Sequence, residues 1–308
     1  MIIGHNPVIM NIKKIVREVS QHDSTVLIIG ETGSGKEFIA REIHRRSRRR
    51  NKPFVVLSCK DLDITIRQED ILGKIEEDAN DILRKTGIFE QAGKGTLFLA
   101  DVHEAPPFYQ KEFISMFSQN KYLRIGSSSF TKIEFRIIAG TSCKRLSKNE
   151  DFRQDLYEFL SNVTISVPPL RKRRQDIPLL VTHFIKVFTD VNKRKFPPMP
   201  SHIFESLMEY SWPGNVSELK NTIRNLVLMS PDGELSTEYL PFEIKKHPLE
   251  YIKNYKLKDA VAEVEKFLIR KNLSRFSGNQ SKAAKAIGIS EAAFRYKMKK
   301  FGITKNNY

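Results

Sequence analysis

The stretch 30–37, with the sequence GETGSGKE, constrains the fold of this 308-residue chain more than any other feature. It follows an apolar run at 24–30 and opens an amphipathic stretch at 35–48, which is the context of a phosphate-binding loop. Its glycines let the backbone turn tightly and direct N–H groups at phosphate oxygens, and Lys36 adds a positive charge. The alternative, a Gly-rich turn, would leave Lys36 without a role. We predict that the whole loop frames a bound phosphate group: Gly30, Glu31, Thr32, Gly33, Ser34, Gly35, Lys36 and Glu37.

Short apolar runs alternate with amphipathic stretches up to residue 170. The runs typical of buried strands lie at 24–30, 53–59, 95–101, 135–141 and 163–167. The stretches with helical periodicity lie at 7–20, 35–48, 106–118 and 152–160. This alternation predicts an α/β fold with a largely parallel sheet covered on both faces. Beyond Pro168 and Pro169 the pattern is helical, at 176–192, 201–209 and 215–229, and 231–248 is typical of a linker.

Charge and cysteine content narrow the class of partner. Lys and Arg number 52 against 36 Asp and Glu, a formal charge of +16 that favours a polyanionic partner such as nucleic acid over a merely solvated basic surface. The two cysteines, Cys59 and Cys143, have no metal-ligand or disulfide spacing, so we expect a cytoplasmic protein without a metal site of its own. No window reaches the roughly 18 apolar residues of a membrane span, so no membrane partner is expected.

The C-terminal stretch 277–303 has the pattern of a helix-turn-helix. Gly288 permits a tight corner between two helices, and Ser290 is placed to cap the second. Phe294 and Met298, one turn apart, would pack on the first helix. We predict that these residues contact double-stranded DNA: Gln280, Ser281, Lys282, Ser290, Glu291, Ala292, Arg295, Tyr296, Lys299 and Lys300. The alternative is a basic helical cap, and the basic run 44–52 is interpreted as a solvated surface.

Several motifs resemble bacterial enhancer-binding proteins, the activators of sigma-54 RNA polymerase. They are the loop at 30–37, GIFEQAGKGTLFL at 87–99, FRQDLY at 152–157, PPLRKRRQDIPLL at 168–180 and WPGNVSELKN at 212–221. The C-terminal stretch resembles the helix-turn-helix of the nucleoid protein Fis. The resemblance implies an AAA+ P-loop domain at 1–170, a helical lid at 171–243, and a linker with a Fis-type DNA-binding domain at 244–308. It also implies ATP or ADP as ligand and a homo-oligomer, either a dimer through the C-terminal region or a higher ring.

The residues that the family uses for ATP hydrolysis are altered here. The family's Walker B strand ends in Asp-Glu, and the matching positions are Ala100 and Asp101. Alanine cannot hold Mg²⁺, and Asp101 is one methylene shorter than the Glu that polarises water. A register shift of one residue would make Asp101 the metal ligand, but strand alternation would point it from the opposite face. Glu37 stands where most P-loops have a Mg²⁺-binding Ser or Thr, so the sequence leaves Mg²⁺ open.

Other catalytic positions of the family are replaced as well. Polar or arginine side chains of the family align with Ser58, Ser142, Phe159 and Ser217. Two positions are kept: Arg153, a candidate arginine finger, and Thr141 in the sensor region. An arginine finger contributes about 10³–10⁵ in rate, so these replacements predict weak or absent hydrolysis.

The stretch 73–87 stands where family activators carry their sigma-54 contact loop, GAFTGA. It is acidic and then helical in pattern, without a Phe-Thr pair. We therefore predict a DNA-binding transcriptional regulator that binds ATP or ADP and does not remodel sigma-54 polymerase, with its polymerase contact left open. Two alternatives remain at this point: an active ATP-hydrolysing sigma-54 activator with a diverged loop, and a partner subunit that regulates a competent ring.

Overall fold

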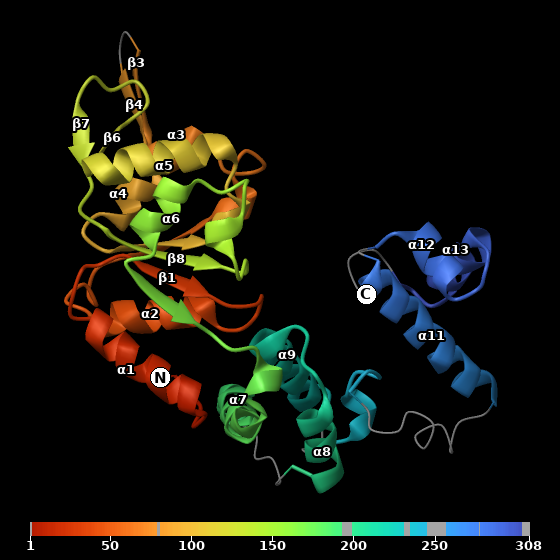
Figure 1. Ribbon diagram of the computed structural model, residues 1–308. Helices are drawn as coiled ribbons and strands as arrows, with labels where there is room; N and C mark the ends of the chain where they lie inside the picture. The colour runs from red at the N-terminus through yellow and green to blue at the C-terminus, as the bar shows by residue number, and fades with distance from the viewer. Residues whose placement is uncertain are drawn as a thin grey trace. The chain divides into compact units, whose positions relative to one another are not determined.

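The computed structural model describes residues 2–78, 81–192, 199–230, 235–244, 257–276 and 278–303. The chain divides into two compact units, Met1–Arg194 with Ser211–Arg224, and Lys195–Tyr210 with Asn225–Tyr308 (Figure 1). Within the described ranges, no helix is both long and apolar enough to cross a membrane.

The first unit is built on five parallel strands in the order β2-β5-β8-β1-β9. Their bounds are β1 Val26–Ile29, β2 Phe54–Ser58, β5 Thr96–Ala100, β8 Arg136–Thr141 and β9 Val163–Ser166. Strand β1 lies between β8 and β9, with Val26 opposite Ile138 on one side and Val163 on the other. Strands that are buried on both faces need apolar side chains throughout, which is why the five predicted runs are nearly continuous in hydrophobicity. All five predictions are confirmed.

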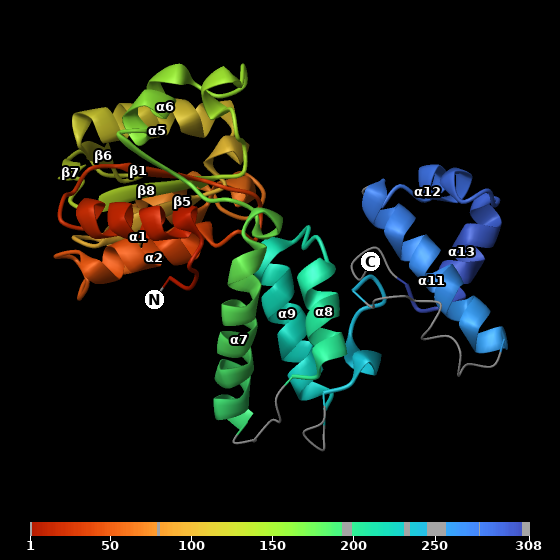
Figure 2. The same ribbon diagram turned by 60° about the horizontal axis from the view of Figure 1, so that its bottom comes forward.

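Alternate residues of each strand face two separate hydrophobic cores. On one face Val26 and Ile28 pack with helices α1 (Pro7–Val19) and α2 (Lys36–Arg46). On the other face Leu27 packs with α4 (Ile88–Ala92), α5 (Pro107–Gln119) and α6 (Gln154–Leu160). Figure 2 shows α1 and α2 on one side of the sheet and α5 and α6 on the opposite side. This is the covered parallel sheet that the sequence predicts, and it exposes the carboxyl ends of the strands at one edge.

Two antiparallel hairpins stand outside the main sheet. One joins β3 (Lys74–Asp78) to β4 (Asp81–Lys85), after the short helix α3 (Gln68–Leu72), and the other joins β6 (Lys121–Leu123) to β7 (Phe130–Lys132). The prediction of a helical pattern within 73–87 is therefore wrong. The backbone of Ile75 pairs instead with Ile125, its N–H donating to the carbonyl oxygen at 2.9 Å. The two strands pair with each other from Lys74 opposite Lys85 to Asp78 opposite Asp81, and this cross-strand pairing overrides the helical periodicity.

The remaining helices follow β9 in sequence. They are α7 (Ile177–Asn192), α8 (Ser201–Glu209), α9 (Asn215–Leu228), α11 (Leu257–Arg275), α12 (Gln280–Ala286) and α13 (Glu291–Lys300). The described residues after β9 contain no further strand, which agrees with the helical pattern of the sequence. Of the predicted linker at 231–248 the structure describes residues 235–244, in which Thr237–Tyr239 form a short 3-10 helix and Leu235, Leu240 and Ile244 are buried.

Candidate functional site

The predicted phosphate-binding loop lies between the end of β1 and the start of α2. Gly33 and Gly35 have φ angles of +74° and +103°, which glycine adopts without the steric cost that other residues meet. A Cβ atom on Gly33 would lie 2.2 Å from the carbonyl oxygen of Gly214, whereas a Cβ on Gly35 would meet nothing within 4 Å. The Ser217 N–H also donates to the Gly33 carbonyl at 3.2 Å. One side of the loop thus rests on the segment that leads into α9, and the other side is open.

A cavity of about 630 Å³ lies at this loop. Its apolar wall includes Ile2 and Ile3 from the N-terminal segment, Ile9 of α1, and Leu180 and Phe184 of α7. Its remaining wall is formed by the loop residues 32–37 and by these polar side chains: Arg41, Asp101, Arg173, His183, Ser217 and Lys220. A mostly apolar hollow beside a few convergent polar groups is the usual form of a small-ligand site.

Lys36 is the central cation of this cavity. Its side chain is only 10% exposed, and its Nζ lies 3.9 Å from Oδ1 of Asp101. Nζ donates to the carbonyl oxygens of Gly30 at 2.9 Å and Glu31 at 3.4 Å. Burial lowers the pKa of Lys36, and the nearby Asp101 carboxylate opposes this shift. The lysine is therefore held against its own loop by weak acceptors, from which a phosphate group could draw it.

The position of Asp101 corrects one step of the sequence reasoning. Strand alternation was expected to direct this side chain away from the metal side of the site. However, β5 ends at Ala100, and Asp101 has a left-handed conformation with φ 50° and ψ 48°. Alternation applies only within an extended strand, so the turn at Asp101 brings its carboxylate to the cavity and to Lys36. Asp is one of the few non-glycine residues that adopt this left-handed conformation readily.

Two polar groups in the cavity wall lack hydrogen-bond partners among the described residues. They are Oγ of Ser34 and Nε of Arg173, both buried. Arg173 is 5% exposed, and its Nη2 donates to the Ser34 carbonyl oxygen at 3.0 Å. Burial lowers the pKa of Arg173. Unsatisfied donors beside a buried guanidinium fit a polyanionic group in the cavity. The sequence reasoning missed Arg173, although its motif at 168–180 was noted.

Glu31 ties the loop to the segment after β9. Arg171 donates to both carboxylate oxygens at 2.7 Å, and Lys144 lies 3.4 Å away. The buried Asn215 donates to the Thr32 carbonyl at 3.0 Å and accepts a hydrogen bond from Leu170 N–H. The hydrogen bonds from Arg171 lower the pKa of Glu31 to about 2. The loop conformation is thus linked to residues 170–217 by charge-assisted hydrogen bonds.

The C-terminal helices α11, α12 and α13 pack around one small core. It contains Ile269, Leu273, Ala283, Ala284, Phe294, Met298 and Ile303. The predicted roles are confirmed at the corner, where Gly288 has φ +75° and the Ser290 side chain accepts a hydrogen bond from Ala293 N–H at 3.2 Å. Asn279, which the sequence reasoning did not single out, caps α12 by accepting from Lys282 N–H at 3.0 Å. The result is a helix-turn-helix with α13 as its second helix.

The predicted DNA-contacting residues lie in the first turns of α12 and along α13, and most are exposed. They include Lys282, Tyr296, Lys299 and Lys300, with Tyr296 68% exposed. Lys297, on the same helix, is not available to DNA in the same way, because it donates to Glu265 of α11 at 2.6 Å and is largely covered. Periodicity could not reveal this contact, because the partner lies 32 residues earlier on another helix.

Comparisons with known proteins match this arrangement along the chain. A family model described as the sigma-54 interaction domain covers residues 2–166, an AAA+ ATPase lid domain covers 171–254, and a bacterial regulatory protein model of the Fis family covers 260–301. The chain belongs to the sigma-54-dependent family of transcriptional regulators. The predicted architecture, an α/β AAA+ domain with a helical lid and a Fis-type helix-turn-helix, is thereby confirmed.

Individual relatives are similar over nearly the whole chain. Regulatory protein AtoC of Escherichia coli K12 is 34% identical over 98% of this chain and 68% of its own length. A signal-transduction and transcriptional-control protein of Clostridium beijerinckii is 37% identical, and this chain spans 48% of its length. Crystal structures of NtrX from Brucella abortus with ADP and with ATP have TM-scores of 0.67 and 0.66 at 30% identity. They cover 98% and 97% of this chain, and it covers 69% of each.

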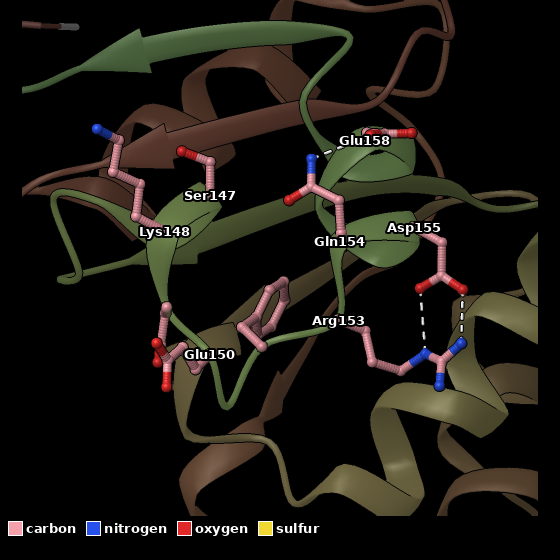
Figure 3. A pocket seen from close by; sticks show the side chains of 9 residues that line it. Ser147, Lys148, Glu150, Arg153, Gln154, Asp155 and Glu158 are labelled. Carbon is pink, nitrogen blue, oxygen red and sulfur yellow. Dashed lines mark hydrogen bonds and ion pairs between the residues drawn. The ribbon is translucent and has the colours of Figure 1, made fainter.

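Arg153, the candidate arginine finger, lies apart from this cavity. It lines a separate hollow of about 770 Å³ at the start of α6, with Phe152 and Glu158. Figure 3 shows its guanidinium turned toward Asp155, with distances of 2.6 Å from Nη2 to Oδ2 and 3.1 Å from Nε to Oδ1. These bonds lower the pKa of Asp155. Arg153 is therefore paired within its own chain.

The sensor-region positions support the strands rather than lining the cavity. The buried Thr141 ends β8, and its carbonyl accepts from Gly30 N–H at 3.0 Å. Ser142 hydrogen-bonds Nε2 of His103 at 2.9 Å. Phe159, at a family arginine position by the resemblance, stacks on Phe117 with ring centroids 5.8 Å apart. Of the three predicted catalytic residues Asp101, Arg153 and Thr141, the structure brings only Asp101 to the cavity.

Proposed function

We propose that this chain is a DNA-binding transcriptional regulator that uses ATP or ADP as a bound ligand, with little or no hydrolysis and without remodelling sigma-54 polymerase. One observation carries the proposal. Residues 32–37 of the phosphate-binding loop line a cavity in which Ala100 occupies the end of β5, where the resemblance to the family implies an acidic residue. The cavity has what binding requires and lacks groups that phosphoryl transfer requires.

The chain's own residues would hold the nucleotide in distinct ways. Backbone N–H groups of 33–36, at the start of α2, and the Lys36 ammonium would bind the phosphates. The unpartnered donors of Ser34 and Arg173 lie in the same wall. Ile2 and Ile3 would cover the flat face of the nucleotide base, since hydrogen bonds of the residues that follow hold this segment at the cavity. His5 and Asn6 N–H groups donate to the buried Asp176 at 2.7 and 3.0 Å. That NtrX was crystallised with ADP and with ATP supports the same assignment.

Magnesium would depend on few groups. Glu37 accepts from Arg41 on its own helix at 2.8 Å, an exposed pair one turn apart. Asp101 is the other carboxylate that lines the cavity, and it faces Lys36. Mg²⁺ would have to compete with Lys36 for the Asp101 carboxylate. We therefore expect nucleotide binding to depend only weakly on Mg²⁺.

The partner we propose is double-stranded DNA. Two copies of the chain would form a dimer through the C-terminal region, and α12 and α13 of each copy would contact the DNA. A Fis-type motif supports this, because such modules bind two-fold half-sites as two-fold dimers. A higher ring through the AAA+ domain is compatible with the family. The same proposal includes the domain boundaries predicted from the sequence: an AAA+ domain at 1–170, a helical lid at 171–243, and the linker with the DNA-binding domain at 244–308.

A second candidate function is an active, slow ATPase that acts on sigma-54 polymerase. The contact between Asp101 and Lys36 favours it, because an acidic side chain reaches the cavity despite Ala100. Under this alternative Asp101 would take over the role of the missing carboxylate.

Nucleotide binding and turnover measured on the same preparation decide between the two. We expect calorimetry to detect ATP and ADP binding that Lys36→Ala weakens at least tenfold, with phosphate release at background. Lys148→Ala, on the separate hollow, is a matched control that should bind normally. Turnover near 1 s⁻¹, low in the usual enzyme range of about 1–10³ s⁻¹, that Asp101→Asn abolishes would establish the second candidate. Absence of any nucleotide binding would refute both.

A further inference from the structure

The first turns of α12 and α13 carry a cluster of four hydrogen-bonded side chains. Arg295 Nη2 donates to Oε1 of Glu291, and Arg295 Nε donates to Oε1 of Gln280 at 3.2 Å. Ser281 Oγ donates to the other oxygen of Glu291 at 2.5 Å. Each carboxylate oxygen therefore has a different partner, and the two helices of the motif are joined through side chains alone.

This cluster faces solvent rather than the core of the motif. The side chains of Arg295 and Glu291 are 65% and 39% exposed, whereas Phe294 and Met298, on the same helix, are buried. An exposed ion pair of this kind contributes little to folding stability. Stability therefore gives little reason for four polar side chains to be held together on this face.

An acidic residue on this face is chemically unusual for a nucleic-acid surface. The exposed neighbours Lys282, Lys299 and Lys300 are all cationic, and Glu291 would lie near phosphates that repel it. Hydrogen bonding from Ser281 lowers the pKa of Glu291, so the group stays ionised and accepts without donating. An ionised Glu291 can only accept hydrogen bonds, so it favours bases that present a donor. In the major groove cytosine presents its N4 amino group as a donor.

Arg295 supplies the complementary chemistry. Its Nε and Nη2 are engaged, and its Nη1 makes no hydrogen bond to a described residue. Guanidinium donors match the O6 and N7 acceptors of guanine. Residues four apart on a helix are neighbours, with Cβ atoms roughly 5–6 Å apart, so the two side chains reach adjacent base pairs.

We infer that Glu291 and Arg295 form one base-reading pair, in which Glu291 selects cytosine at one base pair and Arg295 selects guanine at an adjacent one. Ser281 and Gln280 are positioning residues that hold the pair in its reading orientation before DNA arrives. Side chains fixed in advance lose less entropy on binding. This inference rests on the proposed DNA-binding function and specifies which bases it reads.

The test is a selection of binding sites from a random 30-base-pair duplex pool by the full chain and by variants. We expect the wild type to select half-sites with adjacent cytosine and guanine. Glu291→Gln, which can donate as well as accept, should lower discrimination at the cytosine position from roughly 5- to 100-fold to under about threefold. It should also raise affinity for unrelated duplexes, because one negative charge is removed. Ser281→Ala should relax the same position partly, and Arg295→Ala should relax the guanine position.

Lys299→Ala is the control, since a phosphate contact should weaken binding to every duplex without changing the selected sequence. Circular dichroism melting should show that the variants fold. If Glu291→Gln selects the same sequence with the same discrimination, the base-reading role is refuted while DNA binding stands. If the wild type binds no duplex, or if deletion of residues 275–308 leaves duplex binding unchanged, the proposed DNA site itself is refuted.

Discussion

Replacing Glu31 by Gln tests how strongly the phosphate-binding loop is tied to the segment after β9. The substitution keeps size and shape but removes the charge that Arg171 and Lys144 contact at 2.7 and 3.4 Å. The pKa of Glu31 falls from its ordinary value of 4.5 to about 2, chiefly because Arg171 donates to both oxygens. A group that is more acidic in the folded state stabilises that state when it is ionised.

The magnitude follows from that shift after a correction for solvent. A fall from 4.5 to about 2 corresponds to roughly 3 kcal/mol without screening. The Glu31 side chain is 23% exposed and Arg171 is 39% exposed, so water and salt weaken the interaction. We therefore expect Glu31→Gln to cost about 1–2 kcal/mol, less than a buried pair and more than a typical surface pair.

Thermal unfolding by calorimetry at pH 7 measures this cost. A loss of 1–2 kcal/mol lowers the melting temperature of a unit of this size by about 2–8 °C. Glu37→Gln is the matched control, because Glu37 is in the same loop but pairs with Arg41 at half exposure, and it should cost under about 0.5 kcal/mol. The difference between wild type and Glu31→Gln should be full above pH 4.5 and shrink as the pH falls toward 2. Equal melting temperatures for the two variants would refute the reasoning.

Three further outcomes are expected. Ser290→Ala removes the cap of α13 and should destabilise the helix-turn-helix by about 1 kcal/mol in chemical unfolding, whereas Ser274→Ala should have little effect. Burial lowers the pKa of His44, so its contribution to stability is full above 6.5 and is lost as the pH falls; His44→Gln should flatten the melting temperature between pH 7 and 5. Gly33→Ala should strain the loop by about 1–3 kcal/mol and weaken ATP binding measured by calorimetry, since its Cβ would meet Gly214.

The sequence predicted the main sheet and the loop because their signals are local. The five strands are buried on both faces, so their hydrophobicity is continuous and visible without any partner. The N-terminal cap of α13 and the glycine corner before it depend only on neighbouring residues. The roles of Ser290 and Gly288 were therefore predicted correctly. Features of this kind can be predicted from a window of a few residues.

Contacts between distant segments were not predictable in the same way. The start of β3 contacts Ile125, and the cavity combines Ile2 and Ile3 with Arg173, about 170 residues later in the sequence. The error over Asp101 had a different origin. Its direction was inferred from strand alternation, but the strand ends one residue earlier, and sequence patterns locate such ends poorly.

The contacts of the loop bear on how a nucleotide would act if, as we propose, this chain binds ATP or ADP without hydrolysing it. Glu31 binds Arg171, the Thr32 carbonyl accepts from Asn215, and the Gly33 carbonyl accepts from Ser217. These partners lie in or beside α9, the helix that carries the chain from the first compact unit into the second. A nucleotide that moved residues 31–33 would act on these hydrogen bonds whether or not a phosphate is cleaved. A ligand needs only different affinities for two conformations to shift their populations. The loop contacts α9 directly through Asn215 and Ser217, so under our proposal bound ATP or ADP could act on this helix without hydrolysis.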